Sequence, residues 1–90
     1  MPRITLIVYT TLKDKLGFSR KELEGKELGE IIDKICSLKG CADILLDENG
    51  NIKNHFVVSL NSEIIDNKKF RRIKIKNGDI LNIFPPVSGG

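Results

Sequence analysis

Hydrophobic and polar residues alternate near both ends of the chain, and this two-residue period is typical of β-strands. We expect a first strand over Ile4–Tyr9 and a final strand over Ile80–Phe84. The first segment has apolar residues on both faces, with Ile7 and Tyr9 opposite the main apolar side. This pattern predicts a central strand that is covered on both sides.

A helical period dominates the middle of the chain. Apolar residues recur three and four positions apart from residue 27 to 39, and Gly40 lies just past the end. The apolar positions are Leu28, Ile31, Ile32, Ile35 and Leu38. A single short helical turn is expected between Leu12 and Leu16, where Gly17 can end it. The chain should therefore contain one long amphipathic helix that buries its apolar stripe.

Several shorter segments also favour strands. Phe18–Leu23 is heavily charged, as an edge strand often is. Phe56–Leu60 is a nearly continuous apolar strand, and a turn at Asn61–Ser62 leads into a further strand at Glu63–Ile65. Arg71–Ile75 is a candidate for another short strand.

Two other segments affect the topology. Ala42–Leu46 is apolar but has no clear period, so it receives no assignment. Asn77–Gly78, taken alone, predicts a tight antiparallel hairpin between the strands that flank it. The expected fold is α+β, with one main helix packed on a mixed sheet of four or five strands.

Length and composition limit the chain to one small domain. It has 90 residues, of which 40% are hydrophobic and 30% are charged, as in ordinary globular proteins. It has no run of about 20 apolar residues for a membrane helix and no signal peptide. We therefore expect a cytoplasmic protein with no membrane partner.

The net positive charge is small, and many of the basic residues are clustered toward the C-terminus. The net charge is +3, and many cations lie between Lys68 and Lys76. Such a strip could attract nucleic acid. However, the cations near Ile73 and Ile75 alternate with them as on one solvated face of a strand, and only Phe70 offers an aromatic surface for stacking. Nucleic acid is not an expected partner, although a basic binding module remains a rival interpretation.

Metal chemistry is not expected from this sequence. Asp47–Asn51 superficially resembles a calcium loop, but Val58 stands where that loop needs glutamate. Cys36 and Cys41 are five positions apart and match neither a redox Cys-x-x-Cys pair nor a zinc ligand set, and the one histidine, His55, does not complete a site. Free buried thiols are the preferred interpretation, and a Cys36–Cys41 disulfide stays open.

The last residues form a distinct segment. Two prolines after Phe84 stiffen the chain and remove backbone donors, and Gly89–Gly90 has no Cβ that would block entry into a narrow channel. We expect a domain over residues 1–84 and a flexible, protruding reactive tail over residues 85–90. An ordinary frayed terminus is the alternative.

The final fourteen residues, Asn77 to Gly90, closely resemble the end of the MoaD-type sulfur carriers, the family of the small subunit of molybdopterin synthase. Members typically end with Gly-Asp, a hydrophobic strand, Pro-Pro, a hydrophobic residue, a small residue and Gly-Gly. Lys13–Asp14 departs from the Arg-Glu that members often have in the short helix. The resemblance implies a ubiquitin-like β-grasp fold. In that fold the first and last strands pair in parallel at the centre of the sheet, so Asn77–Gly78 would not form a hairpin.

The resemblance also implies a chemistry. An E1-like partner would use ATP to adenylate Gly90, and a sulfur donor would convert it to a thiocarboxylate. The large subunit of molybdopterin synthase would then accept the sulfur for the dithiolene that holds molybdenum or tungsten. On this interpretation the protein binds no cofactor, has no activity alone and joins the large subunit in a hetero-oligomer. The residues expected to direct the tail or enter the partner's channel are Pro85, Pro86, Val87, Ser88 and Gly89.

Other functions remain as alternatives. The protein could instead be a ubiquitin-like modifier that is conjugated to lysines of other proteins through its activated Gly90, or a sulfur carrier for thiazole synthesis or tRNA thiolation. Phe84 also has two interpretations. It is either an exposed anchor for a partner or a cover for its own sheet.

Overall fold

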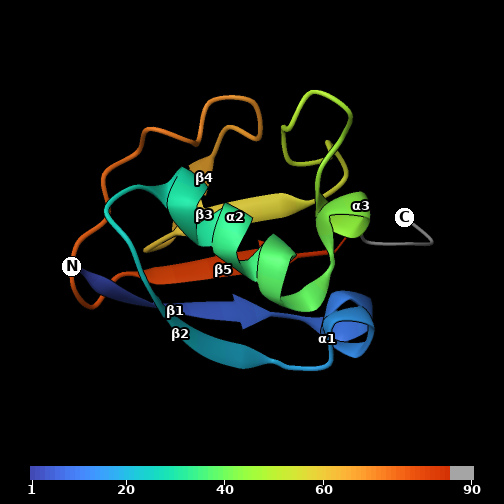
Figure 1. Cartoon of the computed structure of the whole chain (residues 1–90), viewed down its shortest axis with the longest axis horizontal. Coiled ribbons are helices and arrows are strands. Elements are labelled where there is room, and N and C mark those ends of the chain that lie inside the picture. Colours follow the sequence, from blue (N-terminus) through green and yellow to red (C-terminus); the bar gives the residue numbers. More distant parts are fainter. Residues whose placement is uncertain (86–90) are drawn as a thin grey trace.

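Five strands form one mixed sheet in the order β2–β1–β5–β3–β4 (Figure 1). In this computed structural model the described part of the chain is residues 1–85. The strands are β1 Arg3–Val8, β2 Arg20–Glu24, β3 Val57–Leu60, β4 Glu63–Ile65 and β5 Ile80–Phe84. The sheet and its helices confirm the expected α+β class, and the final strand has the predicted bounds.

The centre of the sheet is the parallel pair β1 and β5, whose register runs from Thr5 opposite Ile80 to Val8 opposite Ile83. β2 pairs antiparallel with β1, and β3 pairs antiparallel with β5. Gly78 has a φ of 90° and donates its N–H to the Arg3 carbonyl at 2.9 Å, so the chain enters β5 alongside β1. The simple hairpin prediction at Asn77–Gly78 is therefore wrong, and the parallel pairing of the β-grasp fold is confirmed.

Three helices accompany the sheet, namely α1 Thr10–Leu16, α2 Leu28–Lys39 and α3 Ala42–Leu45. α2 crosses one face of the sheet (Figure 1). Gly17 and Gly40 end α1 and α2 in the left-handed conformation, with φ of 81° and 63°. The sequence period thus located both of these helices, whereas α3 is too short for a period to reveal it. Within residues 1–85, no helix has both the length and the apolar character needed to cross a bilayer.

The apolar stripe of α2 differs from the prediction at its C-terminal end. Leu38 is 64% exposed, whereas Cys36 is buried. These two residues lie on opposite flanks of the stripe, so the period alone favours neither. The chain turns after Gly40 toward the Cys36 side, and this turn buries Cys36 and leaves Leu38 uncovered.

The prediction that β1 is covered on both sides is also wrong. Its residues Ile4, Leu6 and Val8 are fully buried under the helices, as are Leu81 and Ile83 of β5. On the other face Ile7 and Tyr9 stay half-buried. We call this second side the open face of the sheet.

Residues 71–75 form no strand, contrary to the sequence prediction. The Ile73 carbonyl accepts the Leu28 N–H at 2.8 Å, and the Arg71 carbonyl accepts the Gly29 N–H at 3.0 Å. The first turn of a helix has N–H groups without intrahelical partners, and these carbonyls satisfy two of them. We call residues 71–73 the capping loop, because their backbone caps α2 and does not extend the sheet.

Candidate functional site

The predicted tail begins directly after the central strand β5, and we call Phe84 and Pro85 the root of the tail. Phe84, the last residue of β5, is 36% exposed on the open face. Its ring stacks on Tyr9, with centroids 4.5 Å apart and planes 11° from parallel. The Tyr9 hydroxyl in turn donates to Asn82 Oδ1 at 2.6 Å. Phe84 therefore covers part of its own sheet through Tyr9 and is still partly exposed on the open face.

Pro85 is half-buried and lines a small pocket of about 90 Å³ beside α1. Its lining residues are Thr11, Leu12, Lys15, His55, Phe56 and Pro85. None of these six is acidic, and Lys15 is basic. The exposed His55 ring lies against Phe56, with centroids 4.5 Å apart. The tail thus leaves the body from a surface that would favour a partner's negative charge.

The other predicted tail residues, Pro86, Val87, Ser88, Gly89 and Gly90, lie outside the described residues. The expected tail over residues 85–90 is therefore described only at Pro85, next to the expected end of the domain at Phe84. These assignments stay predictions. The structure does describe the surface from which the tail begins.

Exposed apolar side chains gather on the open face next to this root. Cross-strand partners point to the same side of a sheet, and Val57 lies opposite Phe84 while Ser59 lies opposite both Asn82 and Ile64. The open-face patch consists of Val57, Ile64, Ile80 and Phe84, which are 44%, 72%, 43% and 36% exposed. Apart from Met1 and Leu38, these are all of the exposed large hydrophobic residues in the part of the chain that the structure describes.

A charged cluster lies at the opposite edge of the open face. Arg3 of β1 lies 3.5 Å from carboxylates of both Glu22 and Glu24 on β2. These side chains are 47–61% exposed, so the ion pairs add little stability. The open face therefore has a charged edge at β1–β2 and the open-face patch on β5–β3–β4, and a partner that contacts both would dock in one orientation.

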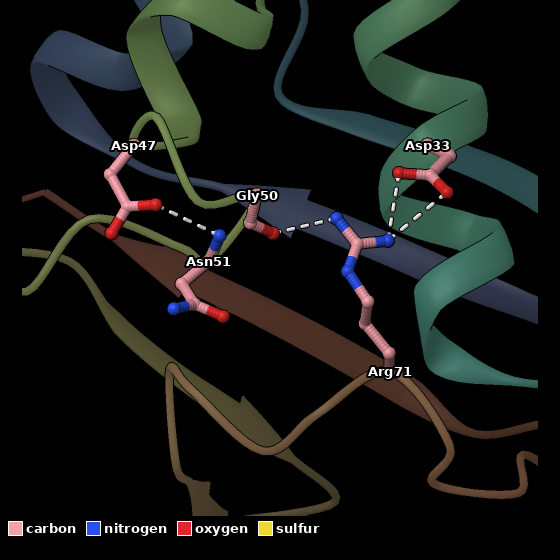
Figure 2. A network of polar contacts seen from close by, with 5 residues as sticks. All are labelled: Asp33, Asp47, Gly50, Asn51 and Arg71. Carbon is pink, nitrogen blue, oxygen red and sulfur yellow. Dashed lines mark hydrogen bonds and ion pairs between the residues drawn. The ribbon is translucent and has the colours of Figure 1, made fainter.

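The described residues provide no metal centre. No group of three or more His, Cys, Asp or Glu side chains within residues 1–85 is arranged to hold a metal ion. Asp47, which begins the segment that superficially resembles a calcium loop, uses its Oδ1 to accept the N–H groups of Asn49 and Asn51 at 2.8 and 3.0 Å. Figure 2 shows the second of these contacts. Asp47 therefore stabilises its own turn.

Sequence reasoning identified Phe84 but missed the rest of the open-face patch. Ile80 shares a face with Phe84 by simple alternation, and this signal could have been used. Val57 and Ile64 join them only through the register of β3 with β5 and β4. Tyr9 likewise reaches Phe84 only because β1 and β5 are neighbours.

Comparison with known proteins agrees with this geometry. The model of the ThiS family matches residues 6–90. No match was found among curated proteins. The chain is similar to the crystal structure of SAMP1 from Haloferax volcanii, with 21% identity over 98% of this chain and 99% of that one and a TM-score of 0.83.

Two other solved structures extend the comparison. The Amycolatopsis orientalis BexX/CysO complex contains a chain that is 29% identical, with 97% of this chain and 99% of that one covered and a TM-score of 0.81. The putative molybdopterin converting factor subunit 1 from Pyrococcus furiosus is 18% identical, with 97% and 100% covered and a TM-score of 0.70. The likenesses below 25% identity establish the shared fold alone. The described chain is thus a β-grasp domain of the ubiquitin-like type.

Proposed function

The chain belongs to the ThiS family of ubiquitin-like β-grasp sulfur carriers, and from this premise we propose that it carries sulfur as a thiocarboxylate on Gly90. The tail would carry the reacting group, and the described domain would provide the surface that partner enzymes bind. The protein itself would bind no cofactor and catalyse nothing alone. It would act in the cytoplasm, where its partner uses ATP.

The chemistry begins with a poor electrophile. A carboxylate is anionic and has no good leaving group, so sulfur does not replace its oxygen directly. Transfer of an adenylyl group from ATP to the Gly90 carboxylate, with release of pyrophosphate, would neutralise it and supply a leaving group. Attack by hydrosulfide on the Gly90 carbonyl carbon would then form the C–S bond, break the bond from that carbon to the adenylyl oxygen, and release AMP and the thiocarboxylate. The adenylating partner would provide the groups that stabilise developing charge.

One observation supports this proposal most strongly. The open-face patch includes Ile80 and Phe84 at the two ends of β5. Pro85, the first tail residue, directly follows Phe84 in the chain. A partner that buries this patch would hold the start of the tail at a defined position. Aromatic and aliphatic anchors of this kind supply much of the binding energy at protein interfaces. The proposed partners are an E1-like adenylating enzyme and the large subunit of molybdopterin synthase.

Synthesis of molybdopterin is the proposed use of the sulfur. The segment Phe84-Pro85-Pro86-Val87-Ser88-Gly89-Gly90 supports it by its resemblance to the small subunit of molybdopterin synthase. The fold that the chain shares with the Pyrococcus furiosus protein agrees with this choice. The large subunit would receive the tail in a channel, and the pterin precursor would accept the sulfur.

Intact mass spectrometry tests the carrier function directly. The purified protein is incubated with its cognate adenylating enzyme, ATP and a sulfide source. We expect the mass of the carrier to increase by the difference between sulfur and oxygen, with the change confined to the C-terminal peptide. A variant that lacks Gly89 and Gly90 and a reaction without ATP should show no change. An unchanged wild-type mass, with an enzyme that is active on another carrier, would reject the proposal.

Protein modification is the second candidate, and the fold shared with SAMP1, the small archaeal modifier protein 1 of Haloferax volcanii, favours keeping it. It requires the same activated Gly90 but ends in an amide bond to lysine. Cells would then contain adducts of higher mass that disappear when the two glycines are deleted. Thiazole synthesis and tRNA thiolation would use the same thiocarboxylate with other acceptors. Assays with purified large subunit and pterin precursor distinguish molybdopterin synthesis from all three.

A further inference from the structure

The end of α2 brings the two cysteines together. Gly40 takes the left-handed conformation, and the Cys41 N–H donates to the Cys36 carbonyl at 3.2 Å. This 6→1 hydrogen bond is characteristic of the Schellman motif at a helix C-terminus. In that motif the two residues joined by the bond commonly make an apolar side-chain contact. In this chain both of those residues are cysteines. In the sequence, the spacing of five between Cys36 and Cys41 does not match a redox motif. In the structure, the helix ending nevertheless brings these two residues together.

The two thiols are buried on the same side of the turn that ends α2. Cys36 is 7% exposed and Cys41 is fully buried. The Cys41 S–H donates to the carbonyl of Ile35, the residue before Cys36, at 3.5 Å. Burial raises the pKa of Cys36 to about 12, with a further increase from the neighbouring Cys41, and burial also raises the pKa of Cys41. Both groups are neutral thiols at physiological pH, and they react slowly while they stay buried at the turn between α2 and α3, which we call the α2–α3 corner.

We propose that Cys36 and Cys41 are the site of a reversible disulfide that joins the end of α2 to the start of α3. The direct backbone hydrogen bond between the two residues places their Cα atoms near the roughly 4.4–6.8 Å that disulfides span. Both side chains are buried at the same turn, and the Cys41 thiol already lies against the carbonyl of the residue before Cys36, so the bond can close without a change in the path of the backbone. This inference is independent of the proposed sulfur-carrier function.

The reaction needs an oxidant, and a low-molecular-weight disulfide is sufficient. The Cys36 thiol is the one that solvent reaches. As a thiolate it attacks one sulfur of the oxidant and releases the first small thiolate. Cys41 then attacks the Cys36 sulfur of the mixed disulfide and releases the second. The two protons lost by the cysteines pass to the two released thiolates, so the protein loses two electrons and the oxidant gains them.

The cross-link would act on the α2–α3 corner. The Leu45 carbonyl of α3 accepts the Lys53 N–H at 2.8 Å, so α3 is held to the chain that leads toward β3. The end of α2 must open before Cys36 attacks the oxidant, because Cys36 is only 7% exposed in the folded protein. Once formed, the bond should slow amide exchange at residues 41–46 and raise the melting temperature by several degrees, as expected for a short closed loop in a small domain.

Peptide mapping tests the proposal, because Lys39 lies between the two cysteines. The folded protein is incubated with glutathione disulfide, its remaining thiols are alkylated, and it is digested with trypsin. After oxidation we expect the peptides that contain Cys36 and Cys41 to be joined, and after reduction to be separate and alkylated. The intact mass should fall by two hydrogens while the protein stays monomeric.

Two single variants, Cys36→Ala and Cys41→Ala, are the matched controls. Each should retain one thiol, form no internal cross-link and show no gain in melting temperature with oxidant. A wild-type product that contains only glutathione adducts or disulfide-linked dimers would overturn the proposal. So would a correct internal bond that leaves both the melting temperature and the exchange at residues 41–46 unchanged.

Discussion

Gly29 lies inside the first turn of α2, where glycine is a poor helix former. The structure explains its presence, because the capping loop crosses α2 at this residue. A Cβ built on Gly29 would lie 2.9 Å from the Arg71 carbonyl oxygen and 3.0 Å from Arg71 Cα. Backbone atoms cannot move aside as easily as the end of a flexible side chain. The close approach thus accounts for a residue that helix propensity disfavours.

Gly29→Ala should therefore destabilise the fold, although alanine favours helices. We expect a loss of about 1–3 kcal/mol in the free energy of unfolding, since the forced shift of the capping loop outweighs the gain of about 1 kcal/mol in propensity. Urea unfolding followed by circular dichroism measures it. Ser37→Ala, at an exposed position of the same helix, should be neutral or stabilising. A stabilised Gly29→Ala variant would contradict the close approach.

Arg71 connects three segments that are distant in sequence. Its Nη1 lies 3.0 Å from Asp33 Oδ1 on α2, and its Nη2 donates to the Gly50 carbonyl at 2.6 Å (Figure 2). The Arg71–Asp33 pair is largely exposed, whereas the contact with Gly50 is partly buried. The two contacts should therefore contribute unequally to stability.

Asp33→Asn should cost less than about 1 kcal/mol, because exposed ion pairs contribute little. Arg71→Ala should cost about 1–3 kcal/mol, because it leaves the Gly50 carbonyl without this donor and removes the packing of the side chain on Phe70. Urea unfolding at low and high salt separates the two effects. Equal losses in the two variants would mean that the ion pair dominates.

At the scale of elements, the C-terminal end of α2 depends on the protonation of its buried thiol. Cys36 has a pKa of about 12 in the folded protein, against 9.0 for the free side chain, chiefly because of burial. The folded state therefore holds this proton more tightly than the unfolded state does. The contribution to stability is present below about pH 9 and is lost as the pH rises toward 12.

Under reducing conditions, the free energy of unfolding should decrease more steeply between pH 9 and 11 for the wild type than for Cys36→Ala. Lysine and tyrosine titrate in both proteins, so the difference between the two curves isolates the thiol. The variant should also be less stable at pH 7, because it leaves a small cavity. Parallel curves above pH 9 would show that Cys36 is accessible in its ionised form.

At the scale of the whole molecule, the sheet has one face covered by helices and one open face. On β5, Leu81 and Ile83 are buried in the core, while Ile80 and Phe84 are exposed on the open face and Pro85 follows directly. In the proposed function, β5 would therefore contribute both to the core and to the surface that partners hold. Stability and function should be separable by mutation.

Ile64→Ser should weaken binding of the adenylating enzyme about 5- to 10-fold and change the stability of the carrier by less than about 0.5 kcal/mol. Ile64 is 72% exposed and belongs to the open-face patch. Leu38→Ser is the control, because Leu38 is 64% exposed but lies on α2. Isothermal titration calorimetry should show unchanged binding for this control. Equal weakening by both substitutions would mean that the patch is not the docking surface.

Gly89→Ala should leave the melting temperature unchanged, because the described core is complete without the tail. It should slow sulfur loading by roughly 10- to 100-fold, since an added Cβ would displace Gly90 in a narrow channel. Ser88→Ala removes atoms from the neighbouring position and should load nearly normally. Mass spectrometry over time measures both rates, and full activity of Gly89→Ala would contradict the narrow channel.

Local patterns in the sequence were sufficient for most elements and for the proposed chemistry. The period of two located β5, and the period of three to four located α2, because regular burial requires regular spacing. Gly17 and Gly40 end helices as expected, because only glycine adopts positive φ without cost. Resemblance in the last fourteen residues indicated both the family and the parallel pairing of β1 with β5.

Only the tertiary structure decided which surfaces meet. Residues 71–73 cap α2 and do not extend the sheet, because unpaired N–H groups of the helix compete for their carbonyls. The open-face patch combines β3, β4 and β5, and the register that aligns them depends on pairing between distant segments. Cys36 and Cys41 come together because the chain reverses at Gly40, where the Cys41 N–H donates to the Cys36 carbonyl and both side chains are buried. Such contacts follow from the path of the whole chain, which spacing along the sequence does not specify.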